Sequence, residues 1–136
     1  MSKLIIIRGL PGSGKTTIAK SVPNAVICEA DNYMIDSFTG NYRFDPNKLR
    51  DCHRLCLERA RQALEVKRTV VVSNTSIRLW ELEPYFALAA HFNVPVYVFK
   101  AVGNYQNIHN VSNNTIQRMR TNYEPYSGEI IVETKG

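Results

Sequence analysis

An eight-residue stretch near the start of the chain limits the possible folds more than any other feature. It occupies residues 9–16, reads Gly-Leu-Pro-Gly-Ser-Gly-Lys-Thr, and follows an isoleucine-rich apolar run at residues 3–8. A continuous apolar run is typical of a strand buried on both faces of a parallel sheet. Residues 14–21 are expected to form a helix directly after the glycines. A strand, a GxxxxGK(S/T) turn and a helix in this order predict a phosphate-binding loop, or P-loop.

Each residue type in this loop suits the binding of a nucleoside triphosphate, ATP or GTP. Glycines let consecutive backbone N–H groups surround a phosphate, and the start of the helix adds the positive end of its dipole. Lys15 can reach the β- and γ-phosphates, and the Thr16 hydroxyl can be a ligand of Mg²⁺. The expected contacts to the nucleotide are Gly9, Leu10, Pro11, Gly12, Ser13, Gly14, Lys15, Thr16 and Thr17.

The rest of the chain alternates strand-like and helix-like segments. Further strands are expected at residues 25–28, 69–73 and 94–99, with a possible edge strand at 129–133. Helices are expected from Asp45-Pro46 to about 66 and over about 78–92 and 114–122. Alternation of this kind predicts βαβ units with right-handed crossovers, hence an α/β sandwich with a small parallel sheet. The 136 residues are expected to form a single domain.

Composition indicates the compartment and the kind of partner. No apolar run approaches the roughly 20 residues of a membrane helix, and Arg8 interrupts the short apolar N-terminus, so no signal peptide is predicted. Three cysteines suit reduced thiols in a cytoplasmic protein. The net charge of +5 favours a polyanionic partner such as nucleic acid, but a moderately basic protein need not bind one.

The absence of two motifs excludes two classes of P-loop protein. There is no Asn-Lys-x-Asp sequence of the kind by which GTPases read their base, and the strand at 69–73 is not followed by the acidic pair of mechanical ATPases. Among P-loop proteins, this leaves the small kinases. Its candidate base is Asp31, which follows the strand at 25–28 and should emerge at the carboxyl edge of the sheet. Asp31 has an equally open alternative role as the N-cap of a short helix at 32–38; the two roles are compatible.

Several further motifs occur in a characteristic order. They are Asp31-Asn32-Tyr33, Tyr42-Arg43-Phe44-Asp45-Pro46, Val71-Val72-Ser73-Asn74-Thr75, Trp80-Glu81-Leu82 with Pro84-Tyr85, and Asn107-Ile108-His109-Asn110-Val111 before Ile116-Gln117-Arg118-Met119. With the phosphate-binding loop, this order resembles the family of P-loop 5′-hydroxyl polynucleotide kinases. That family includes the phage enzymes, the kinase domain of the animal Bcl-three-binding protein and its small stand-alone relatives. The resemblance covers nearly the whole chain.

The resemblance implies a three-layer P-loop kinase sandwich with a helical lid at about 103–122. It implies Asp31 as the base towards a nucleic-acid 5′-OH and Arg118 as a lid arginine on the transferring phosphate, with Arg120 a less favoured second candidate. Tyr33, Arg43 and Asn74 are the candidate contacts to the acceptor.

The chain also departs from the family's pattern. Met34 stands where phage enzymes have an arginine, Asn74-Thr75-Ser76 where they have Asp-Thr-Asn, and Ser73 where the animal relatives have a carboxylate.

Two other patterns have plain structural interpretations. Cys52-His53-x-x-Cys56 resembles a metal-binding pair, but both cysteines fall on the apolar face of the helix with Leu49, Ala60 and Ala63, which favours buried core thiols. The basic residues between 48 and 67 alternate with acidic ones, which favours a solvated helix face over a nucleic-acid contact.

These features together predict a kinase that uses ATP and Mg²⁺ to phosphorylate a hydroxyl, with the 5′-OH of a nucleic-acid end as the expected acceptor. A kinase for a small molecule such as a nucleoside, and a non-catalytic ATP- or partner-binding module, remain as alternatives. The sequence leaves open the choice between DNA and RNA, the oligomeric state and the host process.

Overall fold

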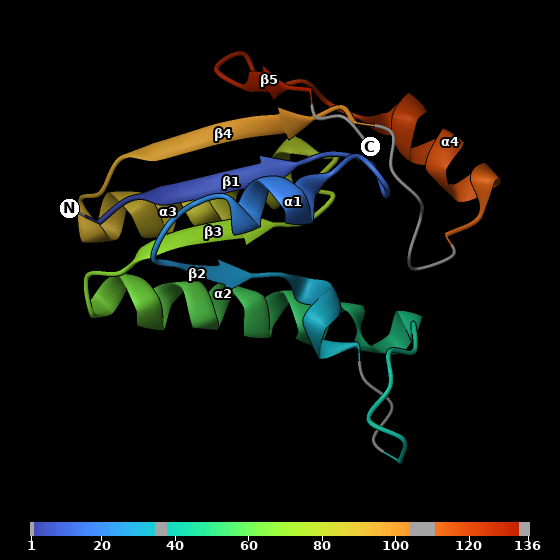
Figure 1. Cartoon of the computed structure of the whole chain (residues 1–136), viewed down its shortest axis with the longest axis horizontal. Helices are drawn as coiled ribbons and strands as arrows, with labels where there is room; N and C mark the ends of the chain where they lie inside the picture. The colour runs from blue at the N-terminus through green and yellow to red at the C-terminus, as the bar shows by residue number, and fades with distance from the viewer. Residues whose placement is uncertain (1, 35–37, 104–110, 134–136) are drawn as a thin grey trace.

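The central element of the fold is a five-stranded, fully parallel sheet. A computed structural model describes residues 2–34, 38–103 and 111–133 (Figure 1). The strands are β1 (Leu4–Arg8), β2 (Ala25–Cys28), β3 (Thr69–Ser73), β4 (Val96–Ala101) and β5 (Ile130–Val132), arranged in the order β2-β3-β1-β4-β5. The predicted α/β fold with a small parallel sheet is confirmed, and the expected tail strand is its edge strand β5, which pairs with β4.

Helices cover both faces of the sheet and make three layers. They are α1 (Lys15–Lys20), α2 (Leu49–Glu65), α3 (Glu83–Phe92) and α4 (Asn113–Asn122), with 3₁₀ turns η1 (Ala30–Tyr33), η2 (Pro46–Lys48) and η3 (Leu79–Glu81). Successive β1 side chains point to opposite faces: Leu4 and Ile6 pack with α2 and α3, whereas Ile5 and Ile7 pack with α1. This two-sided burial explains why β1 is a continuous apolar run. No helix in these described ranges is long and apolar enough to cross a membrane.

The helix spanning residues 46–66 forms as predicted, but it begins with a different turn. Asp45 accepts a hydrogen bond at Oδ1 from the backbone N–H of Asn47 (3.0 Å), and the first turn, η2, is 3₁₀. Cys52 and Cys56 are fully buried thiols, which confirms the prediction of core cysteines. The placement of Leu49 on the buried face is wrong: Leu49 is exposed, because the first turns of α2 extend past the carboxyl end of the sheet (Figure 1).

Two other helix predictions are corrected. The segment at 78–92 divides into η3 and α3, since Pro84 fits only in the first turn of a helix and α3 begins at Glu83. The expected helix at 32–38 is a single turn, η1, and residues 35–37 lie outside the described part of the chain. The N-cap position of η1 is Glu29, so the alternative role of Asp31 as an N-cap is wrong.

Arg8, which interrupts the apolar N-terminal run, is completely buried. Its Nε and Nη2 atoms donate hydrogen bonds to the Ser76 carbonyl oxygen (2.9 and 2.6 Å), and Nη1 forms an ion pair with Glu129 (3.0 Å). The guanidinium also lies 4.3 Å from the centre of the Tyr123 ring, whose hydroxyl donates to Glu129. One side chain thus joins β1, the segment after β3, the end of α4 and the start of β5.

We expect Arg8→Met to lower the free energy of unfolding by about 3–5 kcal/mol, because it leaves the Glu129 carboxylate buried without its cation. The measurement is urea denaturation followed by circular dichroism. The double variant Arg8→Met/Glu129→Gln should lose clearly less than the sum of the two single losses, since it contains no unpaired buried charge. Additive losses would contradict a coupled pair.

Candidate functional site

The phosphate-binding loop is held against the ends of its two neighbouring strands. The Gly9 N–H donates to the Thr75 carbonyl beyond β3 (3.2 Å), and the Gly103 N–H beyond β4 donates to the Ser13 carbonyl (2.8 Å). A Cβ atom on Gly9 would lie 2.7 Å from the Ala101 carbonyl oxygen, so only glycine fits there. Gly14, with φ of 94°, turns the chain into α1. The loop is therefore a fixed concave backbone that precedes a helix, as the motif predicts.

The Lys15 ammonium lies inside this loop. Its Nζ donates a hydrogen bond to the Leu10 carbonyl oxygen (3.0 Å). Burial lowers the pKa of Lys15 to about 8, and the negative charges of Asp31 and Glu29 oppose that shift. Because pH 7 lies below this pKa, Lys15 is mainly in its charged form there. The first backbone N–H groups of α1 have no acceptor within the helix. Together with the Lys15 ammonium, they are the positive groups at the start of this helix.

A side-chain hydrogen bond between Thr16 and Glu29 joins α1 to the segment after β2. The Thr16 hydroxyl donates to Glu29 Oε1 (3.1 Å). A hydroxyl and a carboxylate form the all-oxygen donor set that suits Mg²⁺. Glu29 was missed as a site residue in the sequence analysis, although an acidic residue placed directly after a strand of a parallel sheet is a recognisable signal.

Asp31 lies at the same carboxyl edge of the sheet, in η1, with its side chain exposed. Its charge raises the pKa of Lys15, against the larger effect of burial. The pKa of Tyr42 is also raised, first by burial and then by Asp31. Asp31 is thus within electrostatic reach of the loop lysine on one side and of Tyr42 on the other. The structure brings together Lys15, Thr16 and Asp31, which the sequence analysis selected separately.

Asn74 positions η1. Its buried Oδ1 accepts a hydrogen bond from the Ala30 N–H (2.9 Å), and Nδ2 donates to Cys56 Sγ (3.6 Å). Both polar groups of the amide therefore contact protein, and they fix the backbone next to Asp31. The predicted contact of Asn74 with an acceptor stays a prediction.

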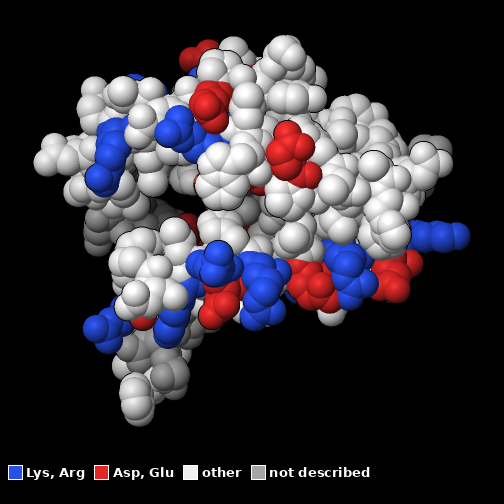
Figure 2. All heavy atoms as spheres, turned by 180° about the vertical axis from the view of Figure 1, so that it is seen from behind, with Lys and Arg blue, Asp and Glu red and all other residues white. Residues whose placement is uncertain are grey.

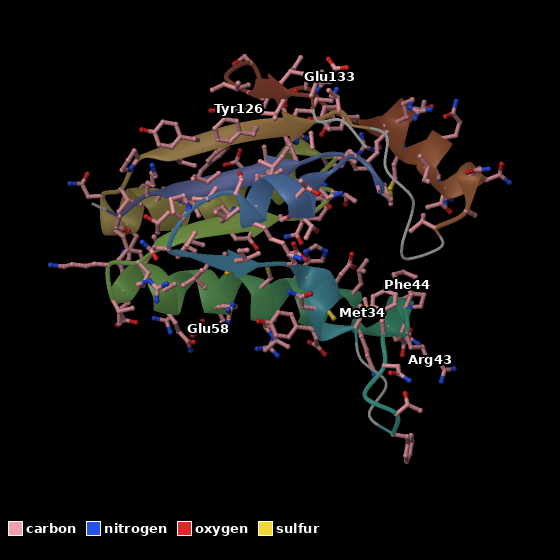
Figure 3. All side chains as sticks on the ribbon, viewed as in Figure 1. Met34, Arg43, Phe44, Glu58, Tyr126 and Glu133 are labelled. Atoms are coloured by element: carbon pink, nitrogen blue, oxygen red, sulfur yellow. The ribbon has the colours of Figure 1, made fainter. Side chains whose placement is uncertain are left out.

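The other two candidate acceptor contacts are Tyr33, in η1, and Arg43, in the segment after it. Tyr33 is half-buried and packs against the core cluster on the α2 side. Arg43 is exposed, and its backbone N–H donates to the Met34 carbonyl (3.0 Å). Figure 3 shows the Arg43 side chain pointing away from the sheet. Neither residue lines the pocket beside the loop.

A pocket of about 610 Å³ lies between the phosphate-binding loop and α4. It is lined by Leu10, Pro11, Gly12, Ser13, Lys100, Ala101, Val102, Gly103, Asn113, Ile116, Arg120 and Tyr123. Tyr123 forms part of its wall with the Lys100 ammonium 4.3 Å from the ring centre. Arg120 lines this pocket, whereas Arg118 is exposed and does not. The role of Arg118 stays a prediction, and residues 104–110 of the expected lid are outside the described ranges.

Basic side chains lie on both sides of the carboxyl edge of the sheet. Seen from behind, the molecule is hollowed between the part that carries α4 and the part that carries η2 and the start of α2, with Lys and Arg on both sides (Figure 2). Further along α2, positive and negative side chains alternate, and they include the ion pairs Arg54–Asp51, Arg61–Glu58 and Arg61–Glu65. That part of the helix is the solvated face that the sequence predicts.

Comparison with known proteins agrees with this geometry. A sequence model of the AAA domain family matches residues 4–102. Human NEDD4-binding protein 2 is 33% identical over 138 residues, which cover 90% of this chain but only 8% of that protein's length. The chain thus spans a small part of its curated relative.

Two solved structures share the fold. One is that of a Pnkp1/Rnl/Hen1 complex (TM-score 0.61, 18% identity, 86% of this chain and 38% of that one). The other is Chaetomium thermophilum Kti12 in complex with ADP-AlF3 (TM-score 0.66, 14% identity, 96% of this chain and 88% of that one). The chain belongs to the AAA domain family and is a P-loop kinase-like domain homologous to part of NEDD4-binding protein 2.

Proposed function

We propose that this chain is an ATP-dependent kinase that transfers the γ-phosphate to the 5′-hydroxyl of a nucleic-acid end. The observation that carries the proposal is the placement of Asp31 within electrostatic reach of Lys15, at the carboxyl edge of a parallel sheet. A cation for the donor phosphates and a carboxylate for the acceptor hydroxyl then lie at the same edge of the sheet. Residues 1–136 act as one kinase domain, with the lid at about 103–122.

The donor side consists of the loop and its lysine. The backbone of residues 9–14 surrounds the phosphates, and Lys15 neutralises charge on the β- and γ-phosphates. Thr16 and Glu29 would hold Mg²⁺, which supplies charge neutralisation between those phosphates when it is bound. The Ser13 hydroxyl is buried and has no hydrogen-bond partner in the described part of the chain, so it is an additional donor for a bound anion.

The acceptor side consists of Asp31 and its supports. Asp31 orients the acceptor hydroxyl and accepts its proton as the new O–P bond forms and the bond from Pγ to the bridging oxygen of ADP breaks. Arg118, as predicted from the family, stabilises the negative charge of the transferring group once the lid closes. Arg120 lies closer to the loop in this structure and is the second candidate for that role.

A nucleic-acid acceptor is supported by charge. Arg43, Lys48 and Arg50 are exposed on the acceptor side, and Arg118 and Arg120 are exposed on α4. A γ-labelled ATP assay with 5′-OH oligonucleotides and nucleosides tests this directly. Transfer to an oligonucleotide should fall steeply with salt, whereas transfer to a nucleoside in a closed pocket would not, and phosphorylation of nucleosides alone would overturn the proposal.

We expect Asp31→Asn to lower kcat by roughly 10²–10⁴, because the amide cannot accept the proton, while the Kd for ATP stays unchanged. The measurement is a single-turnover transfer rate beside a nucleotide-binding titration. Asp51→Asn, an exposed aspartate on α2, is the matched control and should transfer at the wild-type rate. Full activity of Asp31→Asn would exclude Asp31 as the base.

Nucleotide affinity should fall as pH rises through about 8. The phosphates bind the charged form of Lys15, and burial lowers the pKa of the free protein's Lys15 to about 8, so above that pH each bound nucleotide requires uptake of a proton. Titration of a fluorescent ATP analogue between about pH 7.5 and 9.5 measures this. Lys15→Arg, which stays charged, should give a flat profile; a flat profile in the wild type would contradict the assignment.

A further inference from the structure

The segment at residues 42–50, which follows η1 and runs through η2 into the first turn of α2, combines exposed aromatic rings with positive charges; we call it the acceptor arm. Tyr42 and Phe44 are 40% and 55% exposed, and Arg43 lies between them. Leaving two neighbouring aromatic side chains in water forgoes the stabilisation of about 25 cal/mol per Å² that burial gives. Clustered rings of this kind mark a binding surface more often than isolated ones do.

The acceptor arm is tied to the segment that carries Asp31. The Arg43 N–H donates to the carbonyl of Met34 (3.0 Å), and Met34, a buried residue, comes three positions after Asp31. Tyr42 is close enough to Asp31 for the carboxylate to raise the pKa of its phenol. The Asp45 cap then fixes the entry into η2. Tyr42, the first aromatic residue of the arm, is therefore near Asp31, the proposed base.

The side chains of the arm face different ways. Figure 3 shows Phe44 on the side of η2 that faces α4, whereas Arg43 points outward. Lys48 and Arg50, at the C-terminal end of the arm, are exposed and form no ion pair within the part of the chain that the structure describes. They differ in this from Arg54 and Arg61 further along α2, which have acidic partners. Arg59, in the middle of α2, also forms no ion pair in the described chain, but its Nε donates to the Ile27 carbonyl oxygen (3.2 Å), so Lys48 and Arg50 are the charges available beside the rings.

We propose that Tyr42 and Phe44 stack with unpaired bases next to the terminal nucleotide of the acceptor, while Arg43, Lys48 and Arg50 bind its phosphates. The acceptor is then a single-stranded or overhanging 5′ end. This inference rests on the proposed function and specifies its substrate class. Every base has a π face, so stacking selects unpaired strands without reading sequence. In a blunt duplex the bases are already paired and stacked, and freeing them costs a few kcal/mol.

Binding is tested with three 3′-labelled nucleic acids that carry a 5′-OH: a single strand, the same strand without bases at its second and third nucleotides, and a blunt hairpin. Stacking of about 1–3 kcal/mol per base corresponds to roughly 5- to 150-fold in affinity. The wild-type protein should bind the intact strand tighter than the other two by at least the lower end of this range, since the abasic strand lacks both stacked bases. Equal affinity for the intact and abasic strands would overturn the proposal, as would tighter binding of the hairpin.

Phe44→Leu removes one stacking ring, so it should weaken binding of the intact strand by roughly 5- to 150-fold and leave binding of the abasic strand unchanged. Tyr97→Leu is the matched control, since Tyr97 is 44% exposed on β4, away from the arm, and its loss should change neither. Thermal unfolding checks that both variants fold. Equal weakening of both strands by Phe44→Leu would overturn the stacking role.

Arg50→Gln tests the phosphate contacts. It should reduce the slope of log Kd against log salt by about 0.7, the value for one phosphate contact on a single strand. Lys67→Gln, beyond the other end of α2, should leave the slope unchanged, and an unchanged slope in Arg50→Gln would remove that contact from the proposal.

Transfer assays with the same nucleic acids separate the two proposals. Selective binding of the intact strand without phosphate transfer would keep the arm's role and refute the kinase. Transfer that is indifferent to bases and to Phe44 would keep the kinase and refute the arm's role.

Discussion

The close contact of Gly9 with the ends of β3 and β4 is the constraint on which the site depends. Because β1 lies between these two strands, the loop after it can be held from both sides, by the Thr75 carbonyl and by the Gly103 N–H. No side chain fits between Gly9 and Ala101, so the backbone closes directly on the sheet. The neighbouring strands thereby hold the loop backbone in place without a bound anion.

The same strand also supports the opposite side of the site through Arg8. This residue joins the end of α4 and the start of β5 to the centre of the sheet, by an ion pair, two hydrogen bonds to a carbonyl and a ring contact. Tyr123, which contacts Arg8, also lines the pocket beside the loop. The position of α4 relative to the loop is therefore coupled to a buried charge. Because the buried guanidinium of Arg8 needs its partners in place, it favours one position of the end of α4 against the sheet.

The proposed donor and acceptor functions occupy two sides of one sheet edge. The loop and α4 border the pocket on one side, and η1 with the acceptor arm lies on the other. The negative charge of Asp31, in η1, acts on Lys15 in the loop and raises its pKa, against the larger effect of burial. Asn74 stands where phage relatives have an aspartate. Here its amide oxygen accepts a hydrogen bond from the Ala30 N–H and supports the backbone beside Asp31. The carboxylates at this edge are therefore Asp31, which we propose as the base, and Glu29 beside Thr16.

The sequence by itself determined the elements whose signal is local. The apolar runs of β1 and β3, the GxxxxGK(S/T) turn and the buried face of α2 were predictable because each depends on a short pattern of burial or backbone freedom. The tertiary structure alone decided what depends on contacts between distant residues. It buried Arg8 against Glu129, turned the Asn74 amide to Ala30, placed Arg120 at the pocket and Glu29 on Thr16, and left Leu49 in solvent. These outcomes follow from which strands are neighbours and where a helix passes the end of the sheet, and a local pattern carries no information on either.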